Sequence, residues 1–195
     1  MTTSRGRRPG APDTRAEVLD AAKVLFAERG FSRTTIRAVA SDAGVDPSLV
    51  HHYFGTKDDL FMAALALPMD PRELLGPIVA AGPDGAGERL VRTLLSVWDD
   101  PRVRPALLAV ARSVIGDDGG RLVGEGFIPV VIGPVLAALA VDRPEVRIPL
   151  VVSQLVGLIV TRYVLALTGM VEMPAEDVVV RLGPTIQRYL TGDLD

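Results

Sequence analysis

TTIRAVASDAGVDPSLVHHYFGTK, residues 34–57, contains the signals for two short helices separated by a turn. Ile36, Val39 and Ala40 have the i, i+3 and i+4 spacing that gives a helix one apolar face. Gly44 follows and can adopt the positive φ at which helices commonly end. The pattern therefore predicts a short amphipathic helix that stops at a glycine-centred turn.

The second helix has its start marked by two adjacent residues. Asp46 is a favoured N-cap and Pro47 a favoured first helical residue, so the helix is predicted to run from Pro47 to about Tyr53. Thr56 and Asp59 have the spacing of a capping box, which predicts a third helix. Two short helices around a tight turn are typical of a DNA-reading helix-turn-helix.

Residues 19–60 resemble the N-terminal helix-turn-helix of the TetR family of transcriptional regulators. The resemblance rests on TTIRAVASDAGVDPSLVHHYFGTKDDL, in which a His-rich helix is followed by a phenylalanine and by a lysine that opens the next helix. It implies an all-α fold with an N-terminal three-helix DNA-binding head in residues 1–60. A C-terminal helical effector-binding and dimerisation domain would follow in residues 61–195. Asp13 and Gly30 are predicted to bound the head's support helix.

The second helix must divide its side chains between the core and DNA. With Val50 and Phe54 inward, the 3.6-residue period leaves the remaining positions on or near the exposed arc. Those positions are Pro47, Ser48, Leu49, His51 and His52. Ser48 can donate to a base edge or a phosphate, and Leu49 can contact a thymine methyl group. His51 and Tyr53 offer hydrogen-bond donors to phosphates.

The resemblance implies further roles around this helix. Thr35 and Lys57 match positions at which helix starts bind phosphates, and Arg37 matches one from which an arginine reaches a guanine. His51 and His52 match positions that contact the DNA backbone. Because both are histidine, some of the binding is expected to depend on pH near neutrality. No metal site is expected here, because adjacent helical side chains point about 100° apart.

Composition narrows the class of protein. Apolar residues make up 48% of the 195 and charged residues 23%, which fits a well-packed helical protein. The chain has no cysteine, so disulfides, thiolate catalysis and cysteine-ligated zinc are excluded. The net charge of −3 divides into +1 for residues 1–60 and −4 for the rest. Arg5, Arg7 and Arg8 form a positive N-terminal arm, either a DNA-binding arm or a solubilising tail.

The predicted body helices follow from apolar runs and proline positions. The helix after Thr56 should continue to about Leu67, because Pro68 and Pro71 follow. A helix is expected at residues 89–98, and Asp100 should start the next one. Residues 127–140, FIPVVIGPVLAALA, contain prolines and should be kinked or built from short pieces.

The two C-terminal helices predict a homodimer. Residues 150–167 are apolar enough to be tested as a membrane span, but Arg162 lies well inside the run and opposes that interpretation. A helix that is apolar on nearly all sides is expected to be buried on nearly all sides. Residues 174–190 carry a second apolar stripe. One copy cannot bury both faces of the longer helix, so we expect a four-helix bundle of two helices from each subunit.

The predicted function is a cytoplasmic homodimeric repressor of a pseudo-palindromic double-stranded DNA operator, released by a hydrophobic small-molecule effector. Its candidate pocket residues are Trp98, Arg112, Phe127, Gln154 and Tyr163, and residues of these types in helices are more often part of the core or, for Arg112, of a solvated face. The alternative is a ligand-independent DNA-binding regulator controlled by concentration or by a protein partner. An enzyme is not expected, because both histidines lie in the head, and no cofactor or metal is expected.

Overall fold

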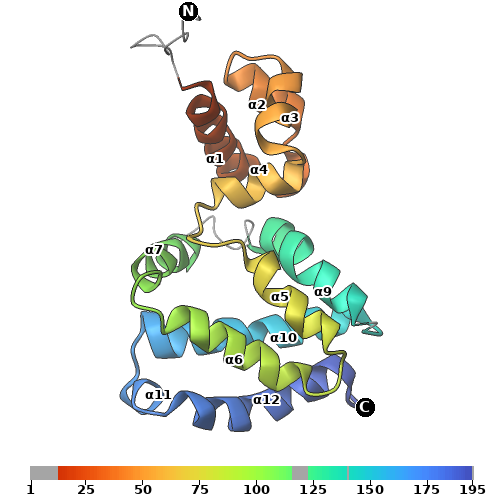
Figure 1. Ribbon diagram of the computed structural model, residues 1–195, viewed down its shortest axis with the longest axis vertical. Coiled ribbons are helices and arrows are strands. Elements are labelled where there is room, and N and C mark those ends of the chain that lie inside the picture. The colour runs from red at the N-terminus through yellow and green to blue at the C-terminus, as the bar shows by residue number, and fades with distance from the viewer. Residues whose placement is uncertain (1–12, 116–122, 140, 195) are drawn as a thin grey trace, which may run out of the picture. The chain divides into compact units, whose positions relative to one another are not determined.

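The computed structural model describes residues 13–194 except 116–122 and 140. The chain divides into two compact units, the first ending at Ala66 and the second beginning at Leu67 (Figure 1). The described residues form helices and contain no β-strand, which confirms the all-α prediction. The expected boundary after residue 60 would fall inside a helix, whereas the units separate beyond that helix. The predicted arginine arm lies outside the described residues.

The described residues of the first unit, from residue 13 on, form four helices. They are α1 (Thr14–Arg33), α2 (Ile36–Asp42), α3 (Pro47–Phe54) and α4 (Lys57–Ala64). Phe26, Phe31 and Phe61 form its aromatic core, with ring centroids 5.1 to 5.9 Å apart. Offset or edge-on aromatic pairs at these distances are favourable. Val39 and Val50, on α2 and α3, are fully buried and place both helices against this core.

Backbone conformation ends the helices of the first unit. Asp13 is the N-cap of α1, as predicted, and Gly30, at φ 76° and ψ 171°, breaks the helix before one further turn. Helix α4 ends at Ala64, so the prediction that it continues to Leu67 is wrong. The reason is Ala66, which has φ 50°, a left-handed conformation that no α-helix continues through.

The second unit contains the remaining helices. They are α5 (Pro71–Ala80), α6 (Ala86–Trp98), α7 (Arg104–Ile115), η1 (Val123–Ile132), α9 (Gly133–Ala138), α10 (Pro144–Ile159), η2 (Val160–Val164), α11 (Thr168–Val171) and α12 (Ala175–Thr191). Sequence analysis missed α5, and it began α7 at Asp100 where the helix starts at Arg104. The proline-containing run near residue 130 is divided between the π-helical η1 and α9, as predicted.

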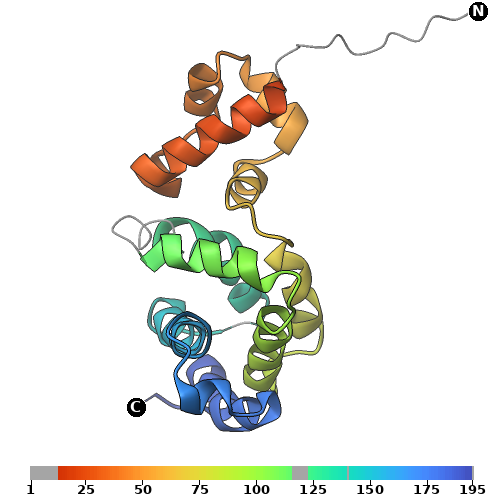
Figure 2. The same cartoon turned by 90° about the vertical axis from the view of Figure 1, so that its left-hand side faces the viewer.

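Helices α6 and α12 cross at two glycines and lie side by side in both views (Figure 1, Figure 2). A Cβ on Gly87 would overlap the carbonyl oxygen of Gly183, and one on Gly183 would lie 2.6 Å from Cγ of Glu88. The backbone N–H of Gly87 donates to Oε1 of Gln187 at 2.9 Å. Only glycine permits backbones to approach this closely.

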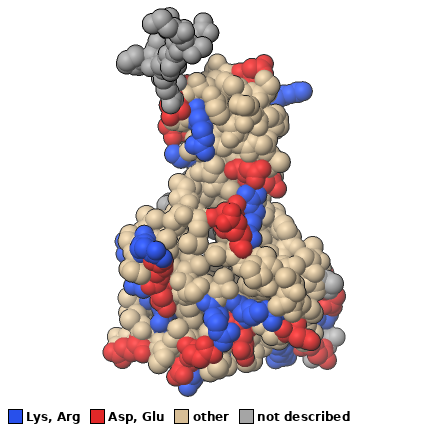
Figure 3. All heavy atoms as spheres, viewed as in Figure 1, with Lys and Arg blue, Asp and Glu red and all other residues tan. Residues whose placement is uncertain are grey.

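Charged side chains mark the outer side of this crossing. Acidic and basic groups are mixed over the part of the second unit that α6 and α12 form (Figure 3). Arg92 of α6 is paired with Glu176 of α12 at 2.6 Å, and Arg181 with Asp177 at 3.2 Å. Exposed pairs of this kind contribute little to stability, so the apolar inner faces hold the helices together.

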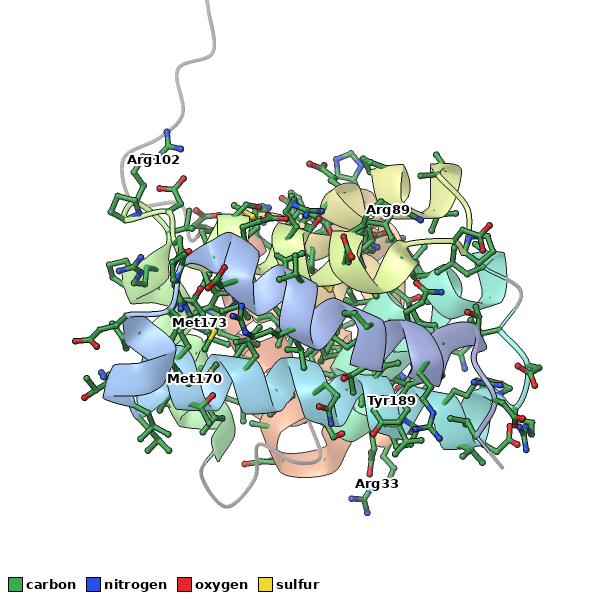
Figure 4. All side chains as sticks on the ribbon, turned by 90° about the horizontal axis from the view of Figure 1, so that it is seen from below. Arg33, Arg89, Arg102, Met170, Met173 and Tyr189 are labelled. Carbon is green, nitrogen blue, oxygen red and sulfur yellow. The ribbon has the colours of Figure 1, made fainter. Side chains whose placement is uncertain are left out.

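Two buried arginines bind backbone at opposite ends of α12. Arg147 donates to the carbonyl oxygens of Tyr189 at 2.9 Å and Gly192 at 3.0 Å. Arg162 donates to the carbonyl oxygens of Met170 and Met173, the latter at 2.9 Å. Figure 4 shows Met173 and Tyr189 at the two ends of the helix. The bond to Tyr189 satisfies one of the carbonyl groups that the C-terminal end of α12 leaves without an intrahelical partner.

The span Pro144–Val164, made of α10 and η2, is long and apolar enough to cross a membrane by length and composition. Only 17% of its most apolar 18-residue stretch is buried within the single chain, which agrees with the expectation that one copy cannot bury both faces of this helix. Val156 of α10 is 43% exposed, and Val180 of α12 is 48% exposed. Each of the two helices therefore leaves apolar side chains uncovered.

Candidate nucleic-acid interface

The turn between α2 and α3 is built by local hydrogen bonds. Gly44 has φ 66°, and the N–H of Val45 donates to the carbonyl oxygen of Ala40 at 2.9 Å. The side chain of Asp46 accepts from the backbone N–H of Ser48 at 2.8 Å and caps α3. Hydrogen bonds from the Ser48 side chain and backbone lower the pKa of Asp46, so its carboxylate stays charged. The predicted helix-turn-helix is therefore present, with α3 as its second helix.

Helix α3 has a buried side and an exposed side. Val50 is fully buried and Phe54 nearly so, as predicted. Their burial leaves the predicted DNA-contact residues of this helix at the surface. Ser48, His51, His52 and Tyr53 are exposed, and Pro47 and Leu49 are half-buried. The exposed side thus offers hydroxyl, imidazole and phenol groups to a ligand.

The starts of α2 and α4 supply the other predicted contacts. Thr35 is the N-cap of α2, and its Oγ1 accepts from the N–H of Ala38 at 3.1 Å, which leaves the hydroxyl hydrogen available to donate. Arg37 is exposed on α2. Lys57, the first residue of α4, is half-buried, and its Nζ lies 4.2 Å from the ring centroid of Phe31. Burial lowers the pKa of Lys57, although the charge of Asp58 opposes this effect.

Sequence analysis missed Arg15 of α1. Its guanidinium lies 4.8 Å from the ring centroid of Phe54, which places a positive charge at the end of α3. The two residues are far apart in the sequence, and no local pattern connects them. A cation over an aromatic face is favourable by about 0.5–1 kcal/mol at exposed sites, so the contact orients a side chain that remains exposed.

The candidate pocket residues of the second unit are only partly brought together. Trp98 is buried and stacks on the half-buried Tyr163, with centroids 5.0 Å apart. Arg112 is exposed on α7, Phe127 is half-buried in η1, and Gln154 is half-buried on α10. Within the described part of the chain, these three form no hydrogen bond, ion pair or ring contact with the stacked pair.

Charged side chains lie on one side of the stacked Trp98–Tyr163 pair. The hydroxyl of Tyr163 donates to Oδ1 of Asp99 at 3.1 Å. Arg104 donates to the carbonyl oxygen of Trp98 at 2.8 Å, and its guanidinium lies 3.5 Å from Asp99. Burial, together with the charge of Asp99 and the hydrogen bond to it, raises the pKa of Tyr163 to about 12. The aromatic pair is thus held by charged groups from α6 and α7.

No group of three or more His, Cys, Asp or Glu side chains in the described residues is placed to hold a metal ion. What the first unit offers is a helix-turn-helix with an exposed second helix and hydrogen-bond donors around it. This arrangement defines a helix-turn-helix DNA-binding protein with a separate helical domain.

Comparison with known proteins identifies the family. Residues 18–64 match the family described as bacterial regulatory proteins, tetR family, and residues 84–190 match the tetracyclin repressor-like C-terminal domain. A TetR-family regulator from Streptomyces coelicolor A3 has a crystal structure with a TM-score of 0.51 and 40% identity, over 95% of this chain and 98% of that one. The chain belongs to the TetR family of DNA-binding transcriptional regulators.

Curated relatives match over only part of the chain. The HTH-type transcriptional regulator BetI of Brucella anthropi is 44% identical over 54 residues, 28% of each chain. The BetI regulator of Paraburkholderia xenovorans is 30% identical over 111 residues, 48% of this chain and 57% of that one. The chain therefore spans about a quarter to about half of the length of these relatives. Their names are those of transcriptional regulators, not of enzymes.

Proposed function

We propose that the protein is a cytoplasmic homodimeric repressor that binds a pseudo-palindromic operator and leaves it when a hydrophobic small molecule binds. The observation that carries the proposal is the exposed side of α3 in a helix-turn-helix of a TetR-family chain. In this proposal residues 1–60 bind DNA, and residues 61–195 bind the effector and form the dimer.

The DNA contacts divide into two groups by chemistry. Helix α3 enters the major groove, where Ser48 and Leu49 meet base edges and His51, His52 and Tyr53 meet the backbone. Pro47 begins the helix at the groove. Thr35 and Lys57 bind phosphates at the starts of α2 and α4, and Arg37 reaches a guanine or a phosphate. Arg15, held over Phe54, adds a positive charge beside the same backbone.

The uncovered apolar side chains of α10 and α12 support the dimer. On α10, Val146, Pro149, Ser153 and Val156 are exposed and lie on one side of the helix. On α12, Val180 and Pro184 are exposed on the side opposite to Val178 and Ile186. Exposed apolar side chains on two neighbouring helices are typical of an association site. Pairing α10 and α12 with the same helices of a second copy produces the four-helix bundle.

The effector site is proposed around Trp98 and Tyr163, with Phe127 as a further apolar wall and Arg112 and Gln154 as polar anchors. Stacked aromatic groups suit an apolar ligand better than a sugar. A bound effector would favour a spacing of the two α3 helices that no longer matches successive major grooves, about 34–36 Å apart. Regulation by concentration or by a protein partner, with no effector, remains the alternative.

DNA binding by the purified protein tests the proposal. The probe is a duplex selected by the wild-type protein from a random library, and the variants are Arg37→Ala and Lys57→Ala. Each variant should bind more weakly, and loss of a phosphate contact should reduce the slope of log affinity against log salt by about 0.9. Arg102→Ala, which removes an exposed arginine of the second unit paired with Asp100, is the control and should change neither quantity.

The effector is tested with a panel of apolar small molecules added to the complex. One compound that releases the wild-type protein from DNA would support the inducible repressor if it also releases Val24→Ala but no longer releases Trp98→Ala. If Arg37→Ala and Lys57→Ala both retain the affinity and salt slope of the wild type, the proposed DNA interface is wrong. Binding that no compound disturbs favours the ligand-independent alternative.

A further inference from the structure

His51 has its proton position set by the backbone. It lies in the last turn of α3, is exposed, and its Nδ1 is 2.8 Å from the carbonyl oxygen of Gly55. A carbonyl oxygen can only accept a hydrogen bond, so Nδ1 must carry the hydrogen. Gly55 has φ 77°, a conformation that glycine adopts without strain and that turns this carbonyl toward the helix end.

The fixed proton limits what the other ring nitrogen can do. In a neutral imidazole with hydrogen on Nδ1, Nε2 has only a lone pair and accepts. Phosphate oxygens also only accept, so neutral His51 cannot hydrogen-bond to the DNA backbone. Once protonated, Nε2 donates a charge-assisted hydrogen bond, which is about twice as strong as a neutral one. The neutral ring is therefore unable to bind a phosphate, whereas the protonated ring is well suited to bind one.

The charged groups around the end of α3 come from each neighbouring helix. From α1, Arg15 lies over Phe54, and from α4, Lys57 lies over Phe31. Also from α4, Asp59 accepts from the N–H and the hydroxyl of Thr56 in the capping box, and Asp58 is exposed beside Lys57.

The remaining charged groups lie on α2 and on α3 itself. Helix α2 carries Arg37 and Asp42, both exposed, and α3 carries His52 and is capped by Asp46. The Asp46 carboxylate already accepts from Ser48 at the far end of α3. In the described residues, none of these four groups forms a hydrogen bond or ion pair with His51.

We propose that His51 is a phosphate-binding residue that acts only as the imidazolium, so that each head takes up one proton when it binds DNA. The inference rests on the proposed DNA interface and adds to it the charge state of one contact. Affinity is then highest where histidine is already protonated. It falls as pH rises through the neutral range, because the bound form must take its proton from solution.

His52 provides the internal comparison. It is the neighbouring residue in the same turn and is also exposed, but its ring lies beside Tyr53, at 5.5 Å between centroids. No hydrogen bond to a backbone carbonyl sets its tautomer in the described structure. Neutral His52 can therefore place a hydrogen on Nε2 and bind a phosphate without taking up a proton.

The test measures affinity for the selected duplex by fluorescence anisotropy from pH 6.0 to 8.5 at constant ionic strength. If His51 of each head takes up one proton on binding, the wild type should lose up to about tenfold in affinity per head for each unit by which the pH rises. His51→Gln should bind with a much flatter profile, and His52→Gln should keep the wild-type slope. His51→Lys carries a positive charge throughout this pH range. It should therefore still bind the duplex at pH 8.5, and its affinity should not fall with pH as that of the wild type does.

A second readout examines the tautomer without DNA. Long-range ¹H–¹⁵N NMR of the free protein at pH 8 should show His51 with hydrogen on Nδ1 and the more common Nε2–H form at His52. Hydrogen on Nε2 of His51 overturns the inference. So does wild-type binding that is independent of pH, or a slope that His51→Gln retains. Absence of binding to any duplex at every pH would instead contradict the proposed DNA interface itself.

Discussion

Three aspartate–proline pairs in this chain make the same local bond. The side chains of Asp46, Asp70 and Asp100 each accept from the backbone N–H two residues later, at 2.8, 2.9 and 2.9 Å. The bond needs only the aspartate and the fixed φ of the proline, so it can be predicted from sequence. A helix follows directly at Pro47 and at Pro71, whereas a turn separates Asp100 from α7.

The third aspartate–proline pair, Asp100–Pro101, is followed by Arg102, whose side chain also binds the aspartate. Its guanidinium binds the Asp100 carboxylate at 2.5 Å, and this hydrogen bond is the main cause that lowers the pKa of Asp100 to about 2. The Asp70 carboxylate binds Arg72 in the same way at 2.6 Å, yet α5 begins at once. The arginine therefore does not explain why α7 starts late.

Tyr163 supports a prediction about alkaline pH. Its pKa is raised from 10.0 to about 12, so the folded protein keeps a proton that an unfolded tyrosine loses. The stabilisation is fully present below pH 10.0 and is lost as pH rises toward 12. Absorbance titration of tyrosinate should show one transition near pH 12 in the wild type that is absent from Tyr163→Phe.

Tyr53→Phe is the control for this titration, because its ring is exposed on the first unit. It should leave the transition near pH 12 in place. The free energy of unfolding should fall between pH 10.0 and 12 in the wild type and in this control, and less in Tyr163→Phe. A wild-type titration that is complete well below pH 12 would contradict the described environment of Tyr163.

At the scale of elements, the crossing of α6 and α12 depends on Gly87 and Gly183. Both glycines lie inside helices of the structure, where glycine usually costs about 0.5–1 kcal/mol relative to alanine. The helix predicted at residues 89–98 did not include Gly87. The close approach of the two backbones explains why they are tolerated. Periodicity identified both helices, but it carries no information on which two helices touch through backbone atoms.

Gly87→Ala should therefore destabilise the protein, because its methyl group overlaps backbone atoms that cannot move aside as a flexible side chain does. The expected loss is about 1–3 kcal/mol in the free energy of unfolding, measured by urea denaturation. The control is Gly76→Ala in α5, where a Cβ meets nothing within 4 Å. It should be stabilising by about 0.5–1 kcal/mol. Equal effects of the two substitutions would show that the crossing is not tight.

At the scale of the whole molecule, the second unit leaves apolar side chains exposed in the single chain. Leu165 is 61% exposed just after η2, and Val156 and Val180 add to the uncovered apolar surface. The proposed dimer covers the α10 and α12 part of it. The proposed dimer would also link the two heads, so that binding of one half-site would raise the effective concentration of the other.

Val180→Asp should weaken this dimer, because it would bury an unpaired charge between the subunits. The dissociation constant should rise at least about 30-fold, equivalent to about 2 kcal/mol, as measured by sedimentation equilibrium. DNA binding should weaken in parallel. Val24→Asp is the control. It alters a valine on α1 of the first unit that is 51% exposed, against 48% for Val180, and the variant should remain dimeric. A dimeric Val180→Asp protein would exclude this face as the interface.

Much of the first unit could be predicted from sequence. The caps at Asp13, Thr35, Asp46 and Thr56, the turn at Gly44, and the burial of Val50 and Phe54 all follow from contacts within a few residues or from helical periodicity. Nine residues of the DNA interface could also be proposed: those on α3 from helical periodicity, and Thr35, Arg37 and Lys57 from the resemblance to the TetR family. None of them lies fully buried in the structure.

Contacts between residues distant in the chain could not be predicted in this way. Arg15 over Phe54, Lys57 over Phe31 and Trp98 on Tyr163 each join residues more than twenty positions apart. Hydrogen bonds of these caps and turns form within five residues, so the local sequence is sufficient for them. Packing between helices depends on how their faces meet, which the pattern of one helix does not specify.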